Sequence, residues 1–231
     1  MGEIILHVKN LNVDKKTSSG AETLISDGCF DISSGEVVRL SGMNGKGKTA
    51  IVKIIMGDSD FKGLNGEIRF CNGENLLLKR DIQDFRSQVI YIEQTDVFAC
   101  ETVFDELFIS LETCKTSLSF KEITGKVEEL LITNDFVKFR KENPRKLSGG
   151  QKRKLSYLVG MIRAQYCKLL IIDEPFGSLD KIQKLTIIGS LKKLVEQNKD
   201  LGILIIHHGS DIDFLITKTL EIQGCRIECN G

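Results

Sequence analysis

The sequence lacks an excess of charge of either sign, because 32 Lys and Arg residues balance 32 Asp and Glu residues. Proteins that bind nucleic acid through its phosphates usually carry a basic excess, so nucleic acid is not an expected partner. Long apolar runs are also missing: a stretch such as residues 203–206 is far shorter than the roughly 20 residues of a membrane-spanning helix. The first residues show no signal-peptide pattern. These absences predict an intracellular protein that does not insert into a membrane.

The sequence also lacks a Cys-x-x-Cys pair, although it contains seven cysteines. Cys225 and Cys229 are the closest in sequence, and no histidine stands near them. An odd number of scattered cysteines is typical of reduced thiols that pack as small hydrophobic side chains. Metal binding by some of them is the alternative.

Short apolar runs without alternation occupy residues 89–92, 169–172 and 203–206, and segments of helical period separate them. Ser119 and Glu122 form a capping-box pair at the start of one helix, and two further helices are expected over residues 150–164 and 181–196. Buried strands that alternate with helices predict a parallel sheet covered on both faces. For the last helix we expect a buried stripe of Ile182, Leu185, Ile188, Leu191 and Val195.

The first third of the chain has the pattern of short strands instead, and the middle of the chain is helical in pattern. The strands are expected at residues 4–8, 29–32, 36–41 and 67–70, with a polar hairpin loop at residues 15–20. The sequence therefore predicts an α/β protein with antiparallel strands ahead of a parallel sheet and a helical insertion in the middle.

Residues 42–49 read Gly-Met-Asn-Gly-Lys-Gly-Lys-Thr and match the phosphate-binding pattern G-x-x-x-x-G-K-[ST] in full. They follow a predicted strand and open an apolar helix, which is the context that this motif needs. Backbone N–H groups and the helix N-terminus would hold the β-phosphate, Lys48 would reach the β- and γ-phosphates, and the Thr49 hydroxyl would ligate Mg²⁺. A glycine-rich turn that binds nothing is the alternative. The nucleotide-binding residues expected here are Gly42, Asn44, Gly45, Lys46, Gly47, Lys48, Thr49 and Ala50.

Two further segments carry polar groups at positions where anions and metals bind. Ser148 and Gln151 have capping-box spacing, and the two glycines between them leave the first N–H groups of a helix open to an anion. A capped helix start without a ligand is the alternative. Later in the chain, an apolar strand delivers Asp173 and Glu174 to its C-terminal end, where doubly wound sheets bind ligands. A strand-end turn before Pro175 is the alternative there.

Taken in order, these segments resemble the nucleotide-binding domain of ATP-binding cassette (ABC) proteins over nearly the whole chain. A Walker A loop (residues 42–49) precedes a Q-loop glutamine, Gln94, and the LSGGQ signature (147–151). A Walker B strand (169–173), a D-loop (177–180) and the pair His207 and His208 follow. The resemblance implies a P-loop NTPase core with a mainly parallel sheet, an N-terminal antiparallel β subdomain and an inserted helical subdomain. The core would comprise about residues 1–94 and 148–231, and the helical subdomain about residues 95–147.

The resemblance also implies a mechanism in which two such domains pair head to tail and enclose two ATP molecules. Each ATP would lie between the Walker A loop of one copy and the signature of the other, and Mg²⁺ would accompany it. Phosphoryl transfer depends mostly on positioning and charge stabilisation, which agrees with such a site. The implied signature contacts are Ser148, Gly149, Gly150 and Gln151, and the implied metal contacts are Thr49, Gln94 and, through water, Asp173. The implied catalytic residues are Lys48, Gln94, Glu174 and His208. Glu174 would polarise the attacking water, His208 would bind the γ-phosphate, and Asp180 would link the two sites.

The chain departs from the family pattern in three places. His207-His208-Gly209 replaces the usual Thr-His-Asp, so His208 takes the switch position if the strand ends at Ile206, and a shift of one residue would exchange the two histidines. Lys15 stands where the family has an aromatic residue that stacks on adenine, and residues 1–29 contain no Phe, Tyr or Trp. We therefore expect weak ATP binding and poor discrimination between ATP and GTP. Lys46 replaces a frequent Ser.

The leading functional hypothesis is the ATPase subunit of a membrane transporter. Its partners would be a second copy of itself or a paralogous ABC subunit, and a separate transmembrane permease that chooses the substrate. The protein would be cytoplasmic and peripheral on the inner face of the cell membrane. The alternative is a soluble single-cassette ABC ATPase in cofactor assembly or another non-transport role. Candidates for the permease contact, which could instead be core residues, are Val97, Phe98, Val103, Phe104 and Phe108.

Overall fold

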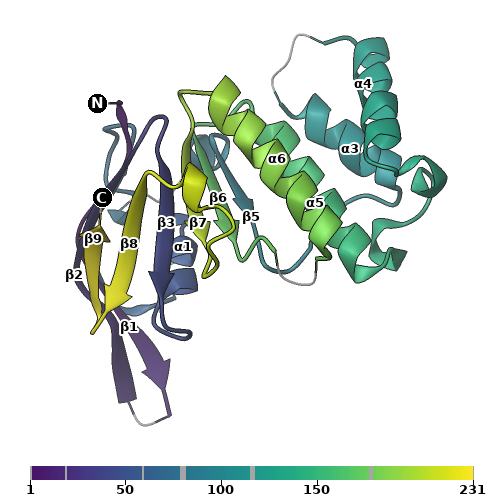
Figure 1. Ribbon diagram of the computed structural model, residues 1–231. Coiled ribbons are helices and arrows are strands. Elements are labelled where there is room, and N and C mark those ends of the chain that lie inside the picture. The colour runs from purple at the N-terminus through teal and green to yellow at the C-terminus, as the bar shows by residue number, and fades with distance from the viewer. Residues whose placement is uncertain are drawn as a thin grey trace.

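The computed structural model describes residues 2–18, 20–58, 60–78, 82–114, 118–176 and 179–230. Two sheets and a set of helices make up the fold (Figure 1). The strands are β1 (Ile4–Thr17), β2 (Gly20–Ser33), β3 (Val37–Gly42), β4 (Lys62–Phe70), β5 (Val89–Ile92), β6 (Leu169–Asp173), β7 (Gly202–Ile206), β8 (Lys218–Gln223) and β9 (Arg226–Asn230). The α-helices are α1 (Lys48–Ile55), α2 (Gln83–Arg86), α3 (Val103–Glu112), α4 (Phe120–Thr133), α5 (Gly149–Ala164) and α6 (Lys181–Gln197).

The larger sheet has the strand order β5-β6-β7-β3-β8-β9, and all of its pairings are parallel except that of β8 with β9. Every residue of β6 and β7 is buried, which explains why these segments read as unbroken apolar runs. The predicted α/β class with a mainly parallel sheet is thus confirmed. Because these strands run in one direction, the carboxyl ends of β5, β6, β7 and β3 meet at one edge of the sheet.

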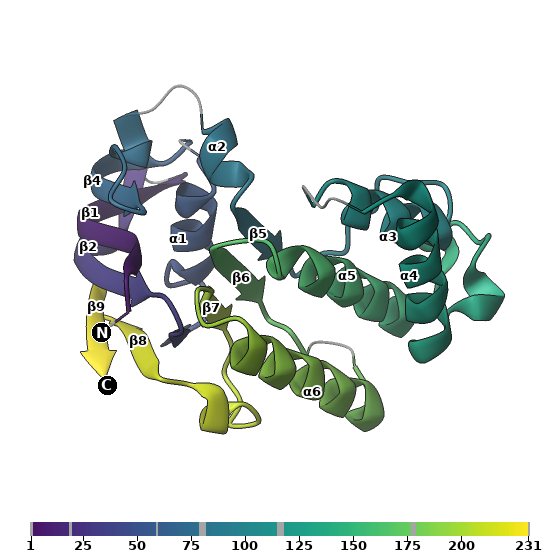
Figure 2. The ribbon, with the colours of Figure 1, turned by 90° about the horizontal axis from the view of Figure 1, so that it is seen from above.

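The smaller sheet has the order β2-β1-β4 and is antiparallel. Helix α1 lies between the two sheets (Figure 2), and its residues Ile51, Val52, Ile54 and Ile55 are buried in a core shared with both. The chain does reverse as a hairpin within residues 15–20, but the loop is shorter than predicted, because Lys15 pairs with Glu22 and Thr17 with Gly20. Cross-strand hydrogen bonds satisfy the backbone of this ribbon whatever its side chains are, so a polar sequence does not end the strands.

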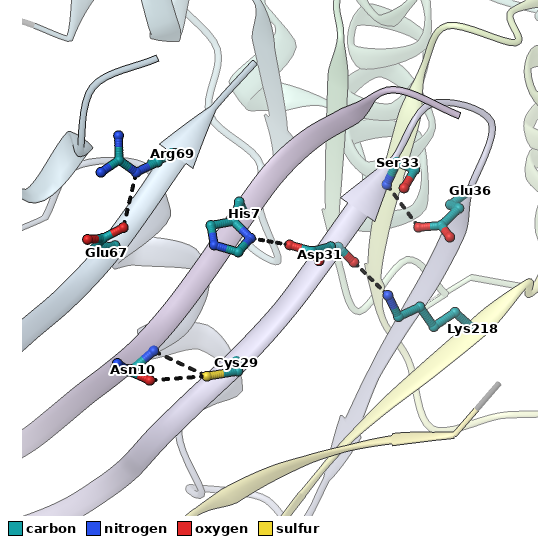
Figure 3. A network of polar contacts seen from close by, with 9 residues as sticks. All are labelled: His7, Asn10, Cys29, Asp31, Ser33, Glu36, Glu67, Arg69 and Lys218. Atoms are coloured by element: carbon teal, nitrogen blue, oxygen red, sulfur yellow. Dashed lines mark hydrogen bonds and ion pairs between the residues drawn. The ribbon is translucent and has the colours of Figure 1, made fainter. Parts of the chain in front are cut away.

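Polar contacts join the smaller sheet to its surroundings (Figure 3). His7 Nδ1 of β1 lies 2.5 Å from Asp31 Oδ1 of β2, and Lys218 Nζ of β8 donates to the backbone oxygen of Asp31 at 2.8 Å. The backbone N–H of Ser33 donates to Glu36 Oε2 at 2.9 Å just before β3 begins. The His7–Asp31 contact joins β1 to β2 within the smaller sheet, and the bonds from Lys218 and Ser33 hold β2 to β8 and to the start of β3, the strand that leads into the phosphate loop.

Helices α3 and α4 lie at the end of the molecule far from β1 and β2 (Figures 1 and 2). They share an apolar cluster with α5, whose Leu155 and Ile162 belong to it. The expected capping box of α4 is present, since Ser119 and Glu122 satisfy each other's backbone N–H groups. Helices α3 and α4 lie within residues 95–147. The exact boundaries of the helical subdomain remain a prediction. No described helix combines the length and the apolarity that crossing a membrane would require.

The expected buried stripe of α6 is wrong at its start. Ile182 is 77% exposed and Leu185 is 60% exposed, whereas Ile187, Leu191 and Leu194 are the buried residues. A helix turns about 100° per residue, so Leu185 lies on nearly the opposite side of α6 from Ile187. The helix carries apolar residues on more than one side, and its packing against the sheet selects one of them.

Candidate active site

The phosphate loop connects the end of β3 to the start of α1. Gly47, the residue before α1, has a φ of 100°, in the left-handed region that glycine adopts most easily. Gly42 has a φ of 134°, and a Cβ atom there would lie 2.9 Å from the backbone oxygen of Ile222. The glycines of the motif are therefore required by backbone conformation and by the close approach of β8.

Lys48 is buried at the first position of α1, with 7% of its surface exposed. Its Nζ donates to the backbone oxygens of Gly42 at 2.7 Å and Met43 at 3.1 Å. Burial lowers the pKa of Lys48, and the carboxylates of Glu174 and Asp173 act in the opposite direction. The ammonium group thus closes the loop and lies where phosphate oxygens could replace the two carbonyls.

Asp173 ends β6 and is only 2% exposed. Thr49 Oγ1 donates to its Oδ2 at 3.3 Å, and the Tyr91 hydroxyl donates to the same oxygen at 3.4 Å. Burial raises the pKa of Asp173, while the hydrogen bonds from Thr49 and Tyr91 and the charges of Arg153 and Lys48 lower it.

The adjacent hydroxyl and carboxylate oxygens of Thr49 and Asp173 suit Mg²⁺, which prefers oxygen ligands and keeps several waters or phosphate oxygens around it. The described residues contain no group of three or more His, Cys, Asp or Glu side chains that could hold a metal ion. Thr49 and Asp173 thus supply two oxygen donors of the kind that Mg²⁺ binds.

Glu174 follows β6 at a sharp bend. Its φ is 46°, and its backbone N–H donates to the oxygen of Ile206, the last residue of β7, at 3.0 Å. His208 Nε2 lies 3.4 Å from Glu174 Oε1, and the His208 side chain is 43% exposed. Because β7 ends at Ile206, the register assumed from the sequence is correct, and His208 is the histidine beside Glu174.

His207 lies in a different environment from His208. It is 7% exposed and packs edge-on against the Phe176 ring, with 4.9 Å between the ring centroids. Its Nε2 is 3.5 Å from Asp211 Oδ2, outside hydrogen-bond geometry. Burial lowers the pKa of His207, and the carboxylates of Glu174 and Asp211 raise it. His207 is therefore a packed side chain, whereas His208 faces the site.

A cavity of about 690 Å³ brings most of the expected residues together at the carboxyl ends of the strands. A second cavity of about 770 Å³ adjoins it, shares Asn44 and His208, and contains the expected residues Gly42 and Lys46. The expected residues that line the first cavity are Asn44, Gly45, Gly47, Lys48, Thr49, Ala50, Gln94, Asp173, Glu174 and His208.

The signature residues lie elsewhere in the chain. Ser148 caps α5, with its backbone N–H donating to Gln151 Oε1 at 2.9 Å, and Asp180 caps α6. A Cβ atom at Gly150 would lie 3.0 Å from the Gln183 side chain, so the starts of α5 and α6 are neighbours. Among the described residues that line the first cavity, none comes from 148–151 or 180. The D-loop residues Gly177 and Ser178 lie outside the described residues.

Arg153 is a residue of this site that the sequence reasoning missed. It is 4% exposed, and its Nη1 donates to the backbone oxygen of Glu93 at 2.5 Å. Its Nη2 donates to the backbone oxygens of Asp173 at 3.1 Å and Glu174 at 3.0 Å. Arg153 thus ties the segment that carries Gln94 to the end of β6.

A sequence signal for Arg153 existed. The buried residues Arg153, Tyr157, Gly160 and Ala164 follow one helical stripe of α5. The guanidinium group also lies over the Tyr157 ring, 5.3 Å from its centroid. A buried guanidinium group needs buried hydrogen-bond acceptors. The position of Arg153 within this stripe therefore predicts that it binds polar groups inside the protein.

Comparison with known proteins agrees with this geometry. Energy-coupling factor transporter ATP-binding protein EcfA1 of Leuconostoc mesenteroides is 29% identical, over 94% of this chain and 78% of its own length. Sulfate/thiosulfate import ATP-binding protein CysA of Bacillus cereus is 34% identical, over 89% of this chain and 57% of its own length. The fold also matches the dimeric, post-hydrolysis structure of the ATP-binding cassette MJ0796 bound to ADP and Pi, with a TM-score of 0.80, 19% identity and 97% coverage of both chains.

The sequence model of the ABC transporter family matches residues 25–177, which include the phosphate loop, the signature and the strand that ends in Asp173. With the order of motifs and the geometry of the cavity described above, this match shows that the chain belongs to the ABC transporter family.

Proposed function

We propose that this protein is an ATP-hydrolysing subunit that powers a separate transmembrane transporter. The observation that carries the proposal is that one cavity is lined by much of the phosphate loop, including Lys48, and by Asp173, Glu174 and His208. The relatives named above are ATP-binding proteins of an energy-coupling factor transporter and of a sulfate/thiosulfate importer, which supports a role in transport.

In this proposal the triphosphate of ATP binds along residues 42–49, with Lys48 at the β- and γ-phosphates. Thr49, Gln94 and, through water, Asp173 would hold Mg²⁺, which when bound neutralises charge on the phosphates. Glu174 would orient and polarise a water molecule, and His208 would contact the γ-phosphate. Each of these groups acts by positioning and charge, as phosphoryl transfer requires.

We infer further that the complete site needs a second chain. Ser148, Gly149, Gly150 and Gln151 lie outside the cavity of their own chain, and the open N-terminus of α5 suits an anion. A head-to-tail pair would bring these residues of one copy, or of a paralogous subunit, over the phosphate loop of the other. Asp180, at the start of the adjacent helix, would lie at the same interface.

A mixing experiment tests this arrangement. Lys48→Ala should inactivate the phosphate loop, and Ser148→Arg should block the signature, so neither variant alone should hydrolyse ATP. In a head-to-tail pair of the two variants, the intact loop of one chain meets the intact signature of the other. Mixing should therefore restore part of the activity, whereas a site completed within one chain would give no recovery.

We propose that the permease binds beside α5, where a cavity of about 260 Å³ is lined by Tyr91, Glu93, Val97 and Arg163, among others. Val97 is 72% exposed, whereas Phe98, Val103 and Phe108 are buried and belong to the apolar cluster of the helices, with Phe104 packed against it. Of the expected contact residues, Val97 is therefore the one we retain. Binding there would hold the protein at the cytoplasmic face of a membrane.

Affinity capture from detergent-solubilised membranes tests the transport role. The wild-type protein should recover an integral membrane protein, and Val97→Arg should lose it while keeping ATP hydrolysis. Recovery of soluble assembly proteins alone, equally by both, would favour the role in cofactor assembly instead.

A further inference from the structure

Two chemically different sets of residues line the first cavity. One set comprises phosphate-loop residues that include Lys48, together with Asp173, and the other comprises Lys15, Leu24 and Phe61. A nucleotide has the same division, with charge on its phosphates and a flat, largely apolar base. We propose that Phe61 is the residue that binds the base of the nucleotide, by stacking its ring on the base. This inference rests on the proposed function.

The strand pairing places Phe61 beside Lys15. Asp14 of β1 pairs with Lys62 of β4, so in antiparallel register the residue before Lys62 lies across from the residue after Asp14. Lys15 and Phe61 both line the cavity, which puts their side chains on the same face. On the other side of β1, Asp14 pairs with Thr23 of β2, next to Leu24. The pairing of β1 with β2 and with β4 thus brings Lys15, Leu24 and Phe61, which directly precedes β4, to the same cavity.

Phe61 offers a flat surface that its surroundings support. It is partly buried and packs against the apolar core formed by α1 and both sheets. It is also the one Phe, Tyr or Trp among the described residues that line this cavity. Stacking of a base on an aromatic ring corresponds to roughly a 10- to 100-fold change in Kd.

This assignment changes what the sequence led us to expect. The expectation of weak ATP binding relied on the absence of an aromatic residue at position 15, and Phe61 supplies a ring from the segment just before β4. The expectation of poor discrimination between ATP and GTP is retained, because stacking uses the face of a base and every base has one. The Lys15 stem can cover part of the base, with its ammonium group in solvent.

The absence of tryptophan from the chain allows a direct test. Phe61→Trp places a single fluorescent indole at the proposed contact. ATP and GTP should quench or shift its emission, whereas inorganic tripolyphosphate, which lacks a base, should bind without this change. Phe214 is 63% exposed and does not line the cavity, so Phe214→Trp is the matched control and should respond to none of the three.

Titrations of Phe61→Leu and Phe61→Ala complete the test. Both should raise the Kd of ATP about 10- to 100-fold and leave the Kd of tripolyphosphate within about twofold. Phe61→Leu keeps an apolar side chain against the core, so this variant should remain folded even if Phe61→Ala does not. An unchanged Kd for ATP in Phe61→Leu, or a Phe61→Trp signal that tripolyphosphate reproduces, overturns the proposal.

Lys48→Ala separates this inference from the proposed function. If wild type binds both ligands, Lys48→Ala binds neither, and Phe61→Leu changes nothing, then the ATP site stands and the role of Phe61 is refuted. If wild type binds neither ligand, both the proposed function and this inference fail.

Discussion

Replacing Arg153 should weaken both the fold and the catalytic step. Arg153→Met keeps most of the length of the side chain but removes every donor. The backbone oxygens of Glu93, Asp173 and Glu174 then each lose a hydrogen bond, and Asp96, whose Oδ1 lies 3.3 Å from Nη1, loses its charged partner. Because the side chains of Arg153 and Asp96 are 4% and 15% exposed, water can replace few of the lost hydrogen bonds.

The size of the effect follows from these contacts. Leaving a buried carbonyl unsatisfied costs about 1–3 kcal/mol, and breaking a buried ion pair by removing one partner costs about 3–5 kcal/mol. The contacts share one side chain and do not add, so we expect a loss of about 3–5 kcal/mol in the free energy of unfolding. Arg153→Lys should lie between wild type and Arg153→Met, because one ammonium group cannot span all the acceptors.

Urea unfolding followed by circular dichroism and steady-state ATP hydrolysis are the two assays. Without Arg153, the segment that carries Gln94 loses its side-chain link to the end of β6 beside Glu174. These residues should then be positioned less well, so kcat should fall about 10- to 100-fold at saturating ATP. Lys152→Ala, on the same helix, is the control and should change stability by no more than about 0.5 kcal/mol. An Arg153→Met protein with wild-type stability and kcat would refute the reasoning.

Three further predictions follow from the same site. His208→Ala should cut turnover strongly with little effect on the melting temperature, whereas His207→Ala should mainly lower the melting temperature; equal losses of turnover would contradict the assignment of His208. Lys15→Tyr should tighten ATP binding in a nucleotide titration, because a second ring would then face the base beside Phe61, and unchanged binding would show that position 15 does not reach it. Burial lowers the pKa of His207 in the folded chain below its ordinary value of 6.5. As the pH drops below about 6.5, His207 therefore binds a proton more readily in the unfolded chain than in the folded chain, and the free energy of unfolding decreases as the pH decreases. Urea titrations should show that the free energy of unfolding of His207→Gln changes less with pH than that of wild type between about pH 7 and 5.5. The same pH dependence in both proteins would show that His207 does not cause it.

The parts of the site that depend on local sequence could be predicted. The glycines and Lys48 follow from the conformation of one loop between a strand and a helix, and the end of β7 at Ile206 follows from an unbroken apolar run. The capping boxes at Ser119 and Ser148 are similarly local, since each joins residues three apart.

The parts that depend on packing between distant segments could not be predicted. Arg153 finds its acceptors on two strand ends, and Phe61 reaches the cavity only because β4 pairs with β1. The exposed face of α6 was misassigned for the same reason, since Ile182 and Leu185 are as apolar as the residues that the sheet buries. Periodicity alone does not choose among several apolar stripes on one helix.

Glu174→Gln tests most directly the proposal that two copies of this chain close on ATP and hydrolyse it with Glu174. The substitution keeps the size of the side chain but removes the carboxylate that would polarise water. It should slow hydrolysis by orders of magnitude and leave ATP binding intact. Light scattering should then show a monomer without nucleotide and a dimer with ATP. A Glu174→Gln protein that remains monomeric with bound ATP, or hydrolyses ATP at the wild-type rate, would contradict the account.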